Sequence, residues 1–145
     1  MNPRPLLPLP VEFGNAEDVH THGTGWMVGF SDWSKDEPHN LRHMPAGTSS
    51  TALCVKWFTH SEGDPNGQDK PLSVGRTMSM LVSDKSEFRL KFSADPRFPF
   101  EGTLEHTLKV KGDFAIWGPG IYHRAYGLKS ATIMTIRWEP QHSAA

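Results

Sequence analysis

The chain has 145 residues, of which 37% are hydrophobic and 21% are charged, a composition typical of one globular domain with its own core. The formal net charge of −1 provides no field that would attract nucleic acid or an anionic membrane, and no apolar run is long enough to span a bilayer. The single cysteine, Cys54, excludes an internal disulfide and a cysteine-based zinc site. We therefore expect a cytoplasmic protein that binds neither nucleic acid nor membrane.

The first ten residues contain four prolines, which interrupt any helix that a signal peptide would need. This composition predicts an extended, polyproline-like N-terminal arm, which packs on its own domain or on a partner subunit, or stays loose. We divide the chain into an arm over residues 1–24, a single β domain over residues 25–140 and a short tail over residues 141–145.

The remaining apolar segments are short and alternate with a period of two, a pattern typical of β-strands. Prolines and glycines leave no long helical pattern between them. We expect the 104–110 strand to pair with the 114–117 strand across the turn at residues 111–113. The regular spacing predicts an all-β antiparallel barrel or jelly roll. The expected strands cover residues 25–31, 51–60, 74–82, 88–92, 104–110, 114–117, 123–126 and 131–138.

One stretch, residues 112–123, combines a strand, a Gly-Pro-Gly turn and a second strand that carries His123. It resembles the second motif of the cupin superfamily, G-x5-P-x-G-x2-H-x3-N. Gly112, Gly120 and His123 match the motif at its spacing, the proline is displaced by one position, and Gly127 stands where the asparagine is expected. Residues 77–92 are similar to the strand-turn-strand that closes the first cupin motif.

The resemblance implies a small double-stranded β-helix with a pocket at its mouth, which in many cupins holds Fe, Mn, Ni or Zn. The first cupin motif would supply two histidines and a glutamate. Aligning Asp84 with the last glycine of that motif puts Thr77 at the glutamate position. The histidine positions then fall on Lys70 and Leu72, or on Pro71 and Ser73 in the shorter spacing. None of these residues is a good metal ligand at neutral pH.

A rearranged metal site remains open. His60 ends a predicted strand and is followed by Glu62, so His60 and His123 could be joined by Glu62 or His106 as a third ligand. The alternative is that His60 lies at a solvent-exposed strand end and His106 on an exposed face.

Further residues are expected at the pocket because they lie close to His123 or to the degenerate first motif. We predict that Tyr122 and Arg76 assist catalysis beside His123. The residues predicted to bind substrate are Tyr126, Thr77, Trp117 and Arg137.

Three functions follow from these features. The first is a small-molecule enzyme that acts at the barrel mouth through a divalent metal held by His60 and His123, for example a dioxygenase, isomerase or lyase. The second is a cupin that binds or senses a metabolite without a functional metal. The third is a metal-free enzyme in which His123 is the general base. In each case we expect a small-molecule ligand and a homodimer formed by sheet augmentation or by exchange of the arm.

Overall fold

The computed structural model describes residues 9–29, 34–35, 40–45, 47–64, 70–73 and 75–141. The secondary structure of this part of the chain consists of antiparallel strands without an α-helix. The strands are β1 (Val11–Asn15), β2 (Ser49–His60), β3 (Arg76–Leu81), β4 (Glu87–Ser93), β5 (Leu104–Leu108), β6 (Asp113–Trp117), β7 (Tyr122–Lys129) and β8 (Ala131–Gln141).

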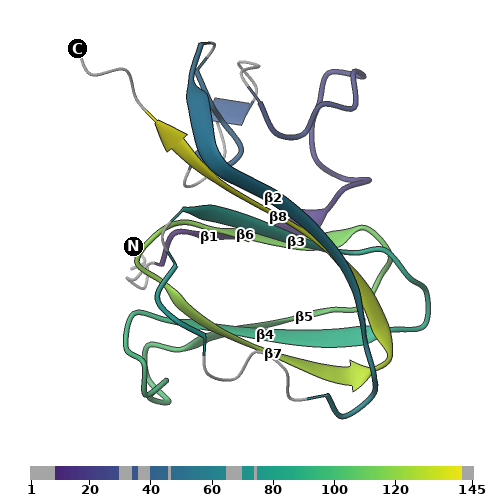
Figure 1. Cartoon of the computed structure of the whole chain (residues 1–145). Coiled ribbons are helices and arrows are strands. Elements are labelled where there is room, and N and C mark those ends of the chain that lie inside the picture. The colour runs from purple at the N-terminus through teal and green to yellow at the C-terminus, as the bar shows by residue number, and fades with distance from the viewer. Residues whose placement is uncertain are drawn as a thin grey trace, which may run out of the picture.

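The strands form two stacked sheets (Figure 1). The larger sheet has the order β1-β6-β3-β8-β2, and the smaller has the order β5-β4-β7. The all-β, antiparallel class is therefore confirmed as a sandwich of the jelly-roll kind. The pairings within the described residues leave two separate sheets rather than a closed barrel.

The core between the sheets follows from the alternation that the sequence shows most clearly in β4. Phe88, Leu90 and Phe92 are buried there, and the residues between them are partly exposed. They pack against Trp117 of β6 and Ile133 of β8 in one apolar cluster. This cluster lies between the two sheets, and four of its residues, Phe88, Leu90, Trp117 and Ile133, also line the pocket described below.

A second cluster covers the outer face of the larger sheet. Side chains from the covering segment, the part of the chain between β1 and β2, pack there on Met78, Ile116 and Trp138. They include Leu41 and Met27. Figure 1 shows this segment on the side of the larger sheet that faces away from the smaller one.

Two arginines attach the covering segment to the sheet. Arg42, fully buried, forms an ion pair with Glu12 of β1, with Nε 3.3 Å from Oε2. Arg76 of β3 donates hydrogen bonds from Nη1 to the carbonyls of Leu41 and His43, at 3.1 and 2.9 Å. The segment is thus tied to the sheet by buried charge as well as by apolar packing.

Several expectations need correction at this level. Residues 25–29, expected to begin a strand, form only an isolated bridge between Gly29 and His43; residues 30–31 lie outside the described residues. Val11–Asn15, assigned to the arm, form β1 and pair with β6. Residues 1–8 and 142–145 likewise lie outside the described part, so the proline-rich arm and most of the tail stay predictions.

The expected pairing of residues 104–110 with residues 114–117 is wrong, because β5 pairs with β4 whereas β6 pairs with β1 and β3. The turn between β5 and β6 carries the chain from one sheet to the other. Gly112 adopts a φ of 98°, and the Asp113 carboxylate accepts hydrogen bonds from the backbone N–H groups of Lys109 and Val110. This arrangement turns the chain away from a simple hairpin.

Candidate functional site: a cationic pocket between the sheets

A pocket of about 350 Å³ opens between the two sheets. Side chains from the inner faces of β2, β3, β4, β6, β7 and β8, together with residues 70–73, form its wall. The lining residues are Lys56, His60, Lys70, Pro71, Leu72, Ser73, Thr77, Ser79, Phe88, Leu90, Trp117, His123, Ala125, Ile133, Thr135 and Arg137.

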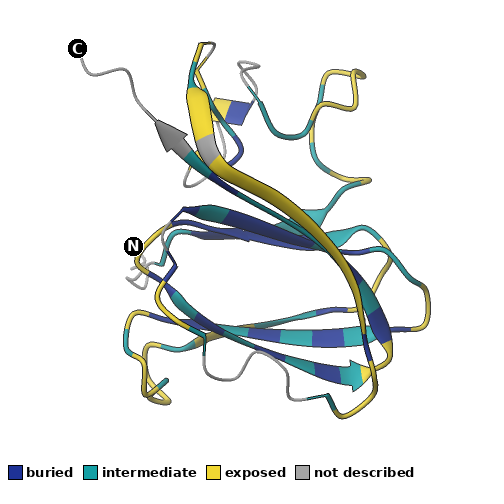
Figure 2. Cartoon of the chain, in the orientation of Figure 1, coloured by how far each residue is buried: buried dark blue, intermediate teal, exposed yellow. Residues whose placement is uncertain are grey.

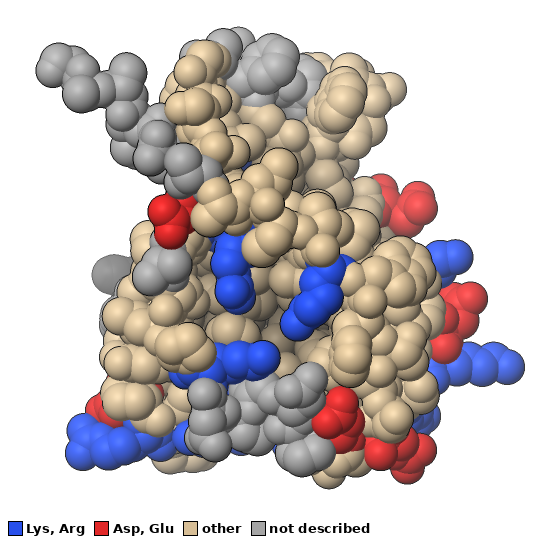
Figure 3. Space-filling model, viewed as in Figure 1, with Lys and Arg blue, Asp and Glu red and all other residues tan. Residues whose placement is uncertain are grey.

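The charged groups around the pocket are all basic. Lys56, Lys70 and Arg137 line it, and no Asp or Glu of the described residues does. The three cations are close enough to interact, since burial lowers the pKa of Lys56 and the charges of Lys70 and Arg137 lower it further. Figure 3 shows Lys and Arg side chains gathered around a hollow on this face of the molecule. The pocket therefore has a positive field.

The pairing of β3 with β8 positions Arg137. Thr77 and Arg137 are opposite each other in the register, and Arg137 Nε donates a hydrogen bond of 3.0 Å to the Thr77 hydroxyl. Two residues further along, the hydroxyls of Ser79 and Thr135 lie 2.9 Å apart. The wall thus presents one oriented guanidinium and a hydrogen-bonded pair of hydroxyls.

His123 lies at one end of the pocket, where it is 9% exposed. Its ring centroid is 4.9 Å from that of Trp117. Burial, followed by the charges of Arg137, Lys70 and Lys56, lowers its pKa to about 4. His123 is therefore neutral near pH 7. Its Nδ1 and the indole Nε1 of Trp117 are buried and meet no hydrogen-bond partner among the described residues.

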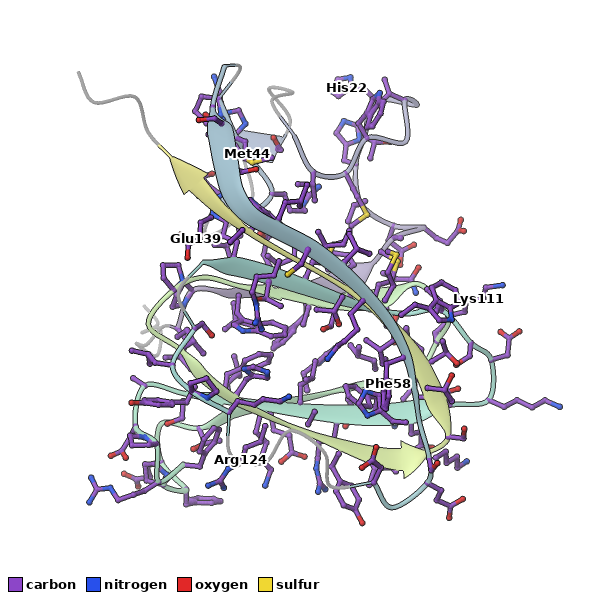
Figure 4. The ribbon with its side chains drawn as sticks, in the orientation of Figure 1. His22, Met44, Phe58, Lys111, Arg124 and Glu139 are labelled. Atoms are coloured by element: carbon purple, nitrogen blue, oxygen red, sulfur yellow. The ribbon has the colours of Figure 1, made fainter. Side chains whose placement is uncertain are left out.

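His60, the last residue of β2, lies at the other end. Its Nδ1 is 3.2 Å from Asp64 Oδ2, and its ring packs against the rings of Phe58 and Phe88. Figure 4 shows Phe58 on the side of β2 that faces the smaller sheet. Burial lowers the pKa of His60; Asp64 opposes this shift through its hydrogen bond and charge, whereas Lys56 adds to it.

The two histidines contact different parts of the wall. His60 lies against Gly127, whereas His123 is four residues earlier on the same strand, β7, about 13 Å away along its backbone. Leu90 and Ala125, which are opposite each other in the pairing of β4 with β7, line the pocket between them. The histidines therefore face the same pocket from opposite ends.

The predicted set of metal ligands is not brought together. Glu62 is exposed and does not line the pocket. His106 stacks on Phe13 at a ring distance of 4.0 Å, away from the pocket. No three His, Cys, Asp or Glu side chains of the described residues form a group that could hold a metal ion. The described lining offers two separated imidazoles among three cations, and this donor set does not fit a divalent metal.

Five predicted site residues do line the pocket: His60, His123, Thr77, Trp117 and Arg137. Their roles remain predictions, but the fold brings them to one place from β2, β7, β3, β6 and β8.

Besides Glu62 and His106, three further predicted site residues lie outside the pocket: Tyr122, Tyr126 and Arg76. On β7 the side chains of His123 and Ala125 line the pocket, so Tyr122 and Tyr126 belong to the outer face of the sheet. The Tyr126 ring lies 5.2 Å from the Arg89 guanidinium. Arg76 points to the covering segment, as described above. The alternation along each strand, applied outward from His123 and Thr77, would have found all three.

The sequence interpretation gave no role to Lys56, Ser79, Thr135 or Asp64, and it considered Lys70 only as a poor substitute for a metal-binding histidine, although Lys70 lines the pocket. Lys56 and Thr135 meet only because β2 pairs with β8 in one register. The one available signal for Asp64 was its position four residues after His60.

Comparisons with known proteins give a partial picture. No family model and no curated protein matches the sequence. Among solved structures, iron(II) HppE in complex with substrate is 13% identical with a TM-score of 0.46, covering 59% of this chain and 46% of that one. HEPD of Streptomyces albus with 2-hydroxyethylphosphonate and Fe(II) is 13% identical with a TM-score of 0.48, covering 61% and 18%.

A third similar structure is the WlaRB TDP-quinovose 3,4-ketoisomerase of Campylobacter jejuni, which is 8% identical with a TM-score of 0.45, covering 63% of this chain and 65% of that one. The matched part thus spans less than half the length of HppE and about a fifth of HEPD. The fold and the site by themselves define an antiparallel β-sandwich with a cationic pocket. Within its described part, the chain contains no helix of the length and apolarity needed to cross a membrane.

Proposed function

We propose that this chain is a single-domain cupin that binds a small organic anion, such as a carboxylate or a phosphate ester, in the pocket between its sheets. The observation that carries the proposal is the set of three cations, Lys56, Lys70 and Arg137, around a pocket whose described lining contains no carboxylate. An anion relieves the mutual repulsion of these cations, whereas a divalent metal would add to it.

The pocket suits such a ligand in volume and chemistry. Its volume of about 350 Å³ falls within the usual range for small-molecule sites. The guanidinium of Arg137 can bind a carboxylate or a phosphate through two hydrogen bonds. Phe88, Leu90 and Ile133 supply an apolar wall for the carbon skeleton. Neutral His123 and His60 complete the site with groups that can exchange a proton.

This proposal replaces the metal-centred function with the metal-free alternatives. Two readings remain within it, a binding or sensing domain and a metal-free enzyme. The lowered pKa of both histidines favours the enzyme, because an imidazole that is unprotonated near pH 7 can act as a general base.

Calorimetric titration of the full chain with inorganic phosphate and with 2-oxobutyrate tests the proposal. We expect binding that weakens as salt is added, and a loss of affinity of about 10-fold or more in Arg137→Gln. Arg89→Gln is the matched control, because Arg89 lies on the outer face of the smaller sheet beside Tyr126.

Two results would count against the proposal. Affinity for both anions that is unchanged in Arg137→Gln would show that the cationic pocket does not bind them. A stoichiometric transition metal in untagged protein, retained through chelation and lost in His123→Gln, would restore the metal-centred function.

A further inference from the structure

The backbone around Asp64 holds this residue in a fixed place beside His60. The loop after β2 is bound to β7, with Gly63 N donating to Gly127 O at 2.7 Å and Gly127 N donating to Asp64 O at 3.2 Å. Asp64 N also donates to Ser61 O at 3.0 Å. A Cβ at Gly127 would lie 2.8 Å from Ser61 O, so glycine permits this close approach. The loop and β7 therefore position the carboxylate relative to the imidazole.

The contact between His60 and Asp64 selects one form of the ring. A carboxylate accepts hydrogen bonds, so it stabilises the tautomer in which Nδ1 carries the proton and Nε2 has a free lone pair. The ring is confined by Phe58 and Phe88, and the residue is 6% exposed. His60, which lines the pocket, is thus held in one place with Nε2 as its proton-accepting atom.

The cations of the same pocket suit a reaction that creates negative charge. Lys56 and Lys70 line the pocket with His60, and both lie near enough to act on its charge state. Arg137 lies toward His123, where it contributes to the field on that ring. Fixed positive groups that face a developing oxyanion are a common and large source of rate enhancement.

We propose that His60, held in its tautomer by Asp64, is the general base of an enolisation, in which it removes a proton from the carbon next to the carbonyl of a bound oxo acid. The C–H bond breaks, the proton passes to Nε2, and the electron pair forms an enolate whose oxygen faces Lys56 and Lys70. Return of a proton to the same or a neighbouring atom regenerates neutral His60. The step balances without an oxidant, a reductant or a metal, and it rests on the anion-binding function proposed above.

Exchange of the C3 protons of 2-oxobutyrate in D₂O, followed by proton NMR, measures this step directly. We expect the full chain to accelerate exchange over buffer and His60→Gln to lose about 100-fold or more of that rate, while calorimetry shows that the ligand still binds. His106→Gln is the matched control, because burial also lowers the pKa of His106, which lies outside the pocket.

Asp64→Ala tests the positioning role. Asp64 raises the pKa of His60, so its removal should move the rising limb of the pH–rate profile to lower pH as well as slow the exchange. A second readout is the ¹⁵N spectrum of the His60 ring, which should show a protonated Nδ1 that depends on Asp64.

The outcomes separate the two proposals. If 2-oxobutyrate binds but exchanges no faster than with His60→Gln, enolisation by His60 is overturned and anion binding stands. If 2-oxobutyrate and phosphate do not bind, the proposed function fails and the enolisation fails with it. A ring protonated on Nε2 would overturn the base role even if a variant does not fold.

A separate observation concerns the outer side of β2. This strand is an edge of the larger sheet, and three of its large apolar side chains, Leu53, Val55 and Trp57, are 63–66% exposed. Val55 and Trp57 pair with Ile136 and Met134, so they continue the sheet face that the covering segment protects elsewhere. Figure 2 shows β2 exposed over most of its length.

An irregularity at Ala52 interrupts the pairing near the start of β2, but from Cys54 to His60 the edge is regular and lacks the other features that normally keep edge strands apart. β2 contains no proline, and its only Lys, Arg, Asp or Glu is Lys56, whose side chain lines the pocket. Its twelve residues reach about 40 Å. The three exposed side chains offer on the order of 300–400 Å² of surface, about half of what each partner contributes to a standard interface; paired backbone and flanking atoms can supply the rest.

We infer that β2 pairs with β2 of a second copy of this chain, antiparallel about a twofold axis. An axis at Val55 sets Leu53 opposite Trp57 on both sides and brings no two like charges together on the outer face. The proposed occupant is thus a second copy, joined by sheet augmentation rather than by arm exchange.

Sedimentation velocity of the full chain is the test. We expect a dimer that Trp57→Lys converts to monomer, whereas Phe100→Lys, at a 97% exposed loop position, leaves it intact. A monomeric wild type at 100 µM, taken as roughly 10-fold above a weak Kd of about 10 µM, would overturn the inference. A dimer that survives Trp57→Lys and is lost on deletion of residues 1–8 would show arm exchange instead.

Discussion

Each end of the pocket carries a histidine, but the two histidines differ in the charge of their neighbours. At one end His123 lies beside Trp117 with its Nδ1 lacking a partner in the described chain, and every charge that shifts its pKa is positive. At the other end His60 has a carboxylate, Asp64, that opposes the shift. Burial is the leading cause at both ends, but the next cause has the opposite sign, because Arg137 lowers the pKa of His123 whereas Asp64 raises that of His60. One histidine is kept neutral by its surroundings alone, and the other is also oriented.

The largest expected effect comes from removing the wall at the His123 end. Trp117→Ala should lower the free energy of unfolding by about 3–5 kcal/mol, because the indole is 1% exposed and packs between the sheets. Denaturant unfolding measures the change. Trp26→Ala is the control, since Trp26 is 69% exposed and should change stability by less than about 0.5 kcal/mol. Equal losses from both variants would show that Trp117 is not a core residue.

Acid should distinguish His123 next. Its pKa is about 4 in the folded chain and about 6.5 in the unfolded chain. Between these values the unfolded state binds more protons, so the free energy of unfolding decreases as the pH is lowered. Between pH 7 and pH 4.5 the unchanged protein should lose about 2–3 kcal/mol more than His123→Gln.

Urea unfolding at the two pH values measures this loss, with the exposed His20→Gln as the matched control. A pH dependence that is the same with and without His123 would show that its charging does not oppose folding.

The smallest effect tests the His60 end. Gly127→Ala places a Cβ 2.8 Å from Ser61 O, so the loop that bears Asp64 must shift, at a cost of about 1–3 kcal/mol. We expect the pKa of His60 to fall further, because Asp64 moves away. An NMR titration of His60 measures this. Gly118→Ala is the control. A Cβ at Gly118 would lie 3.4 Å from its nearest neighbour, a methyl group of Leu41, which is ordinary van der Waals contact. An unchanged pKa of His60 would show that the position of the loop does not control the contact between His60 and Asp64.

The sequence predicted those parts of the fold that depend on local pattern. The alternation of Phe88, Leu90 and Phe92 specified a half-buried strand, and the glycines around residues 112–120 marked the turns that lead to His123. The partner of the 104–110 strand was not predictable in this way, because a turn with the same residues can close a hairpin or cross between sheets. β1 was missed because a five-residue strand after a proline-rich stretch carries little periodicity.

The site was predicted in part for the same reason. Thr77 and Arg137 were expected near His123 individually, yet their hydrogen bond depends on a register between strands about 60 positions apart. The cationic character of the pocket has the same origin, because Lys56, Lys70 and Arg137 are unremarkable in sequence and come together only after the strands pair. The resemblance to metal-binding cupins directed attention to ligands that this chain does not assemble.

The register between β3 and β8 has one more consequence. Arg76 and Thr77 are neighbours in the chain, but one holds the outer covering segment and the other holds the arginine of the pocket. A slip of β3 by a single residue would exchange these faces, moving Met78 into the positive pocket and withdrawing the anchor from the cover. Contacts on both faces of the larger sheet therefore depend on the same register, and a misaligned β3 would lose contacts on both faces at once.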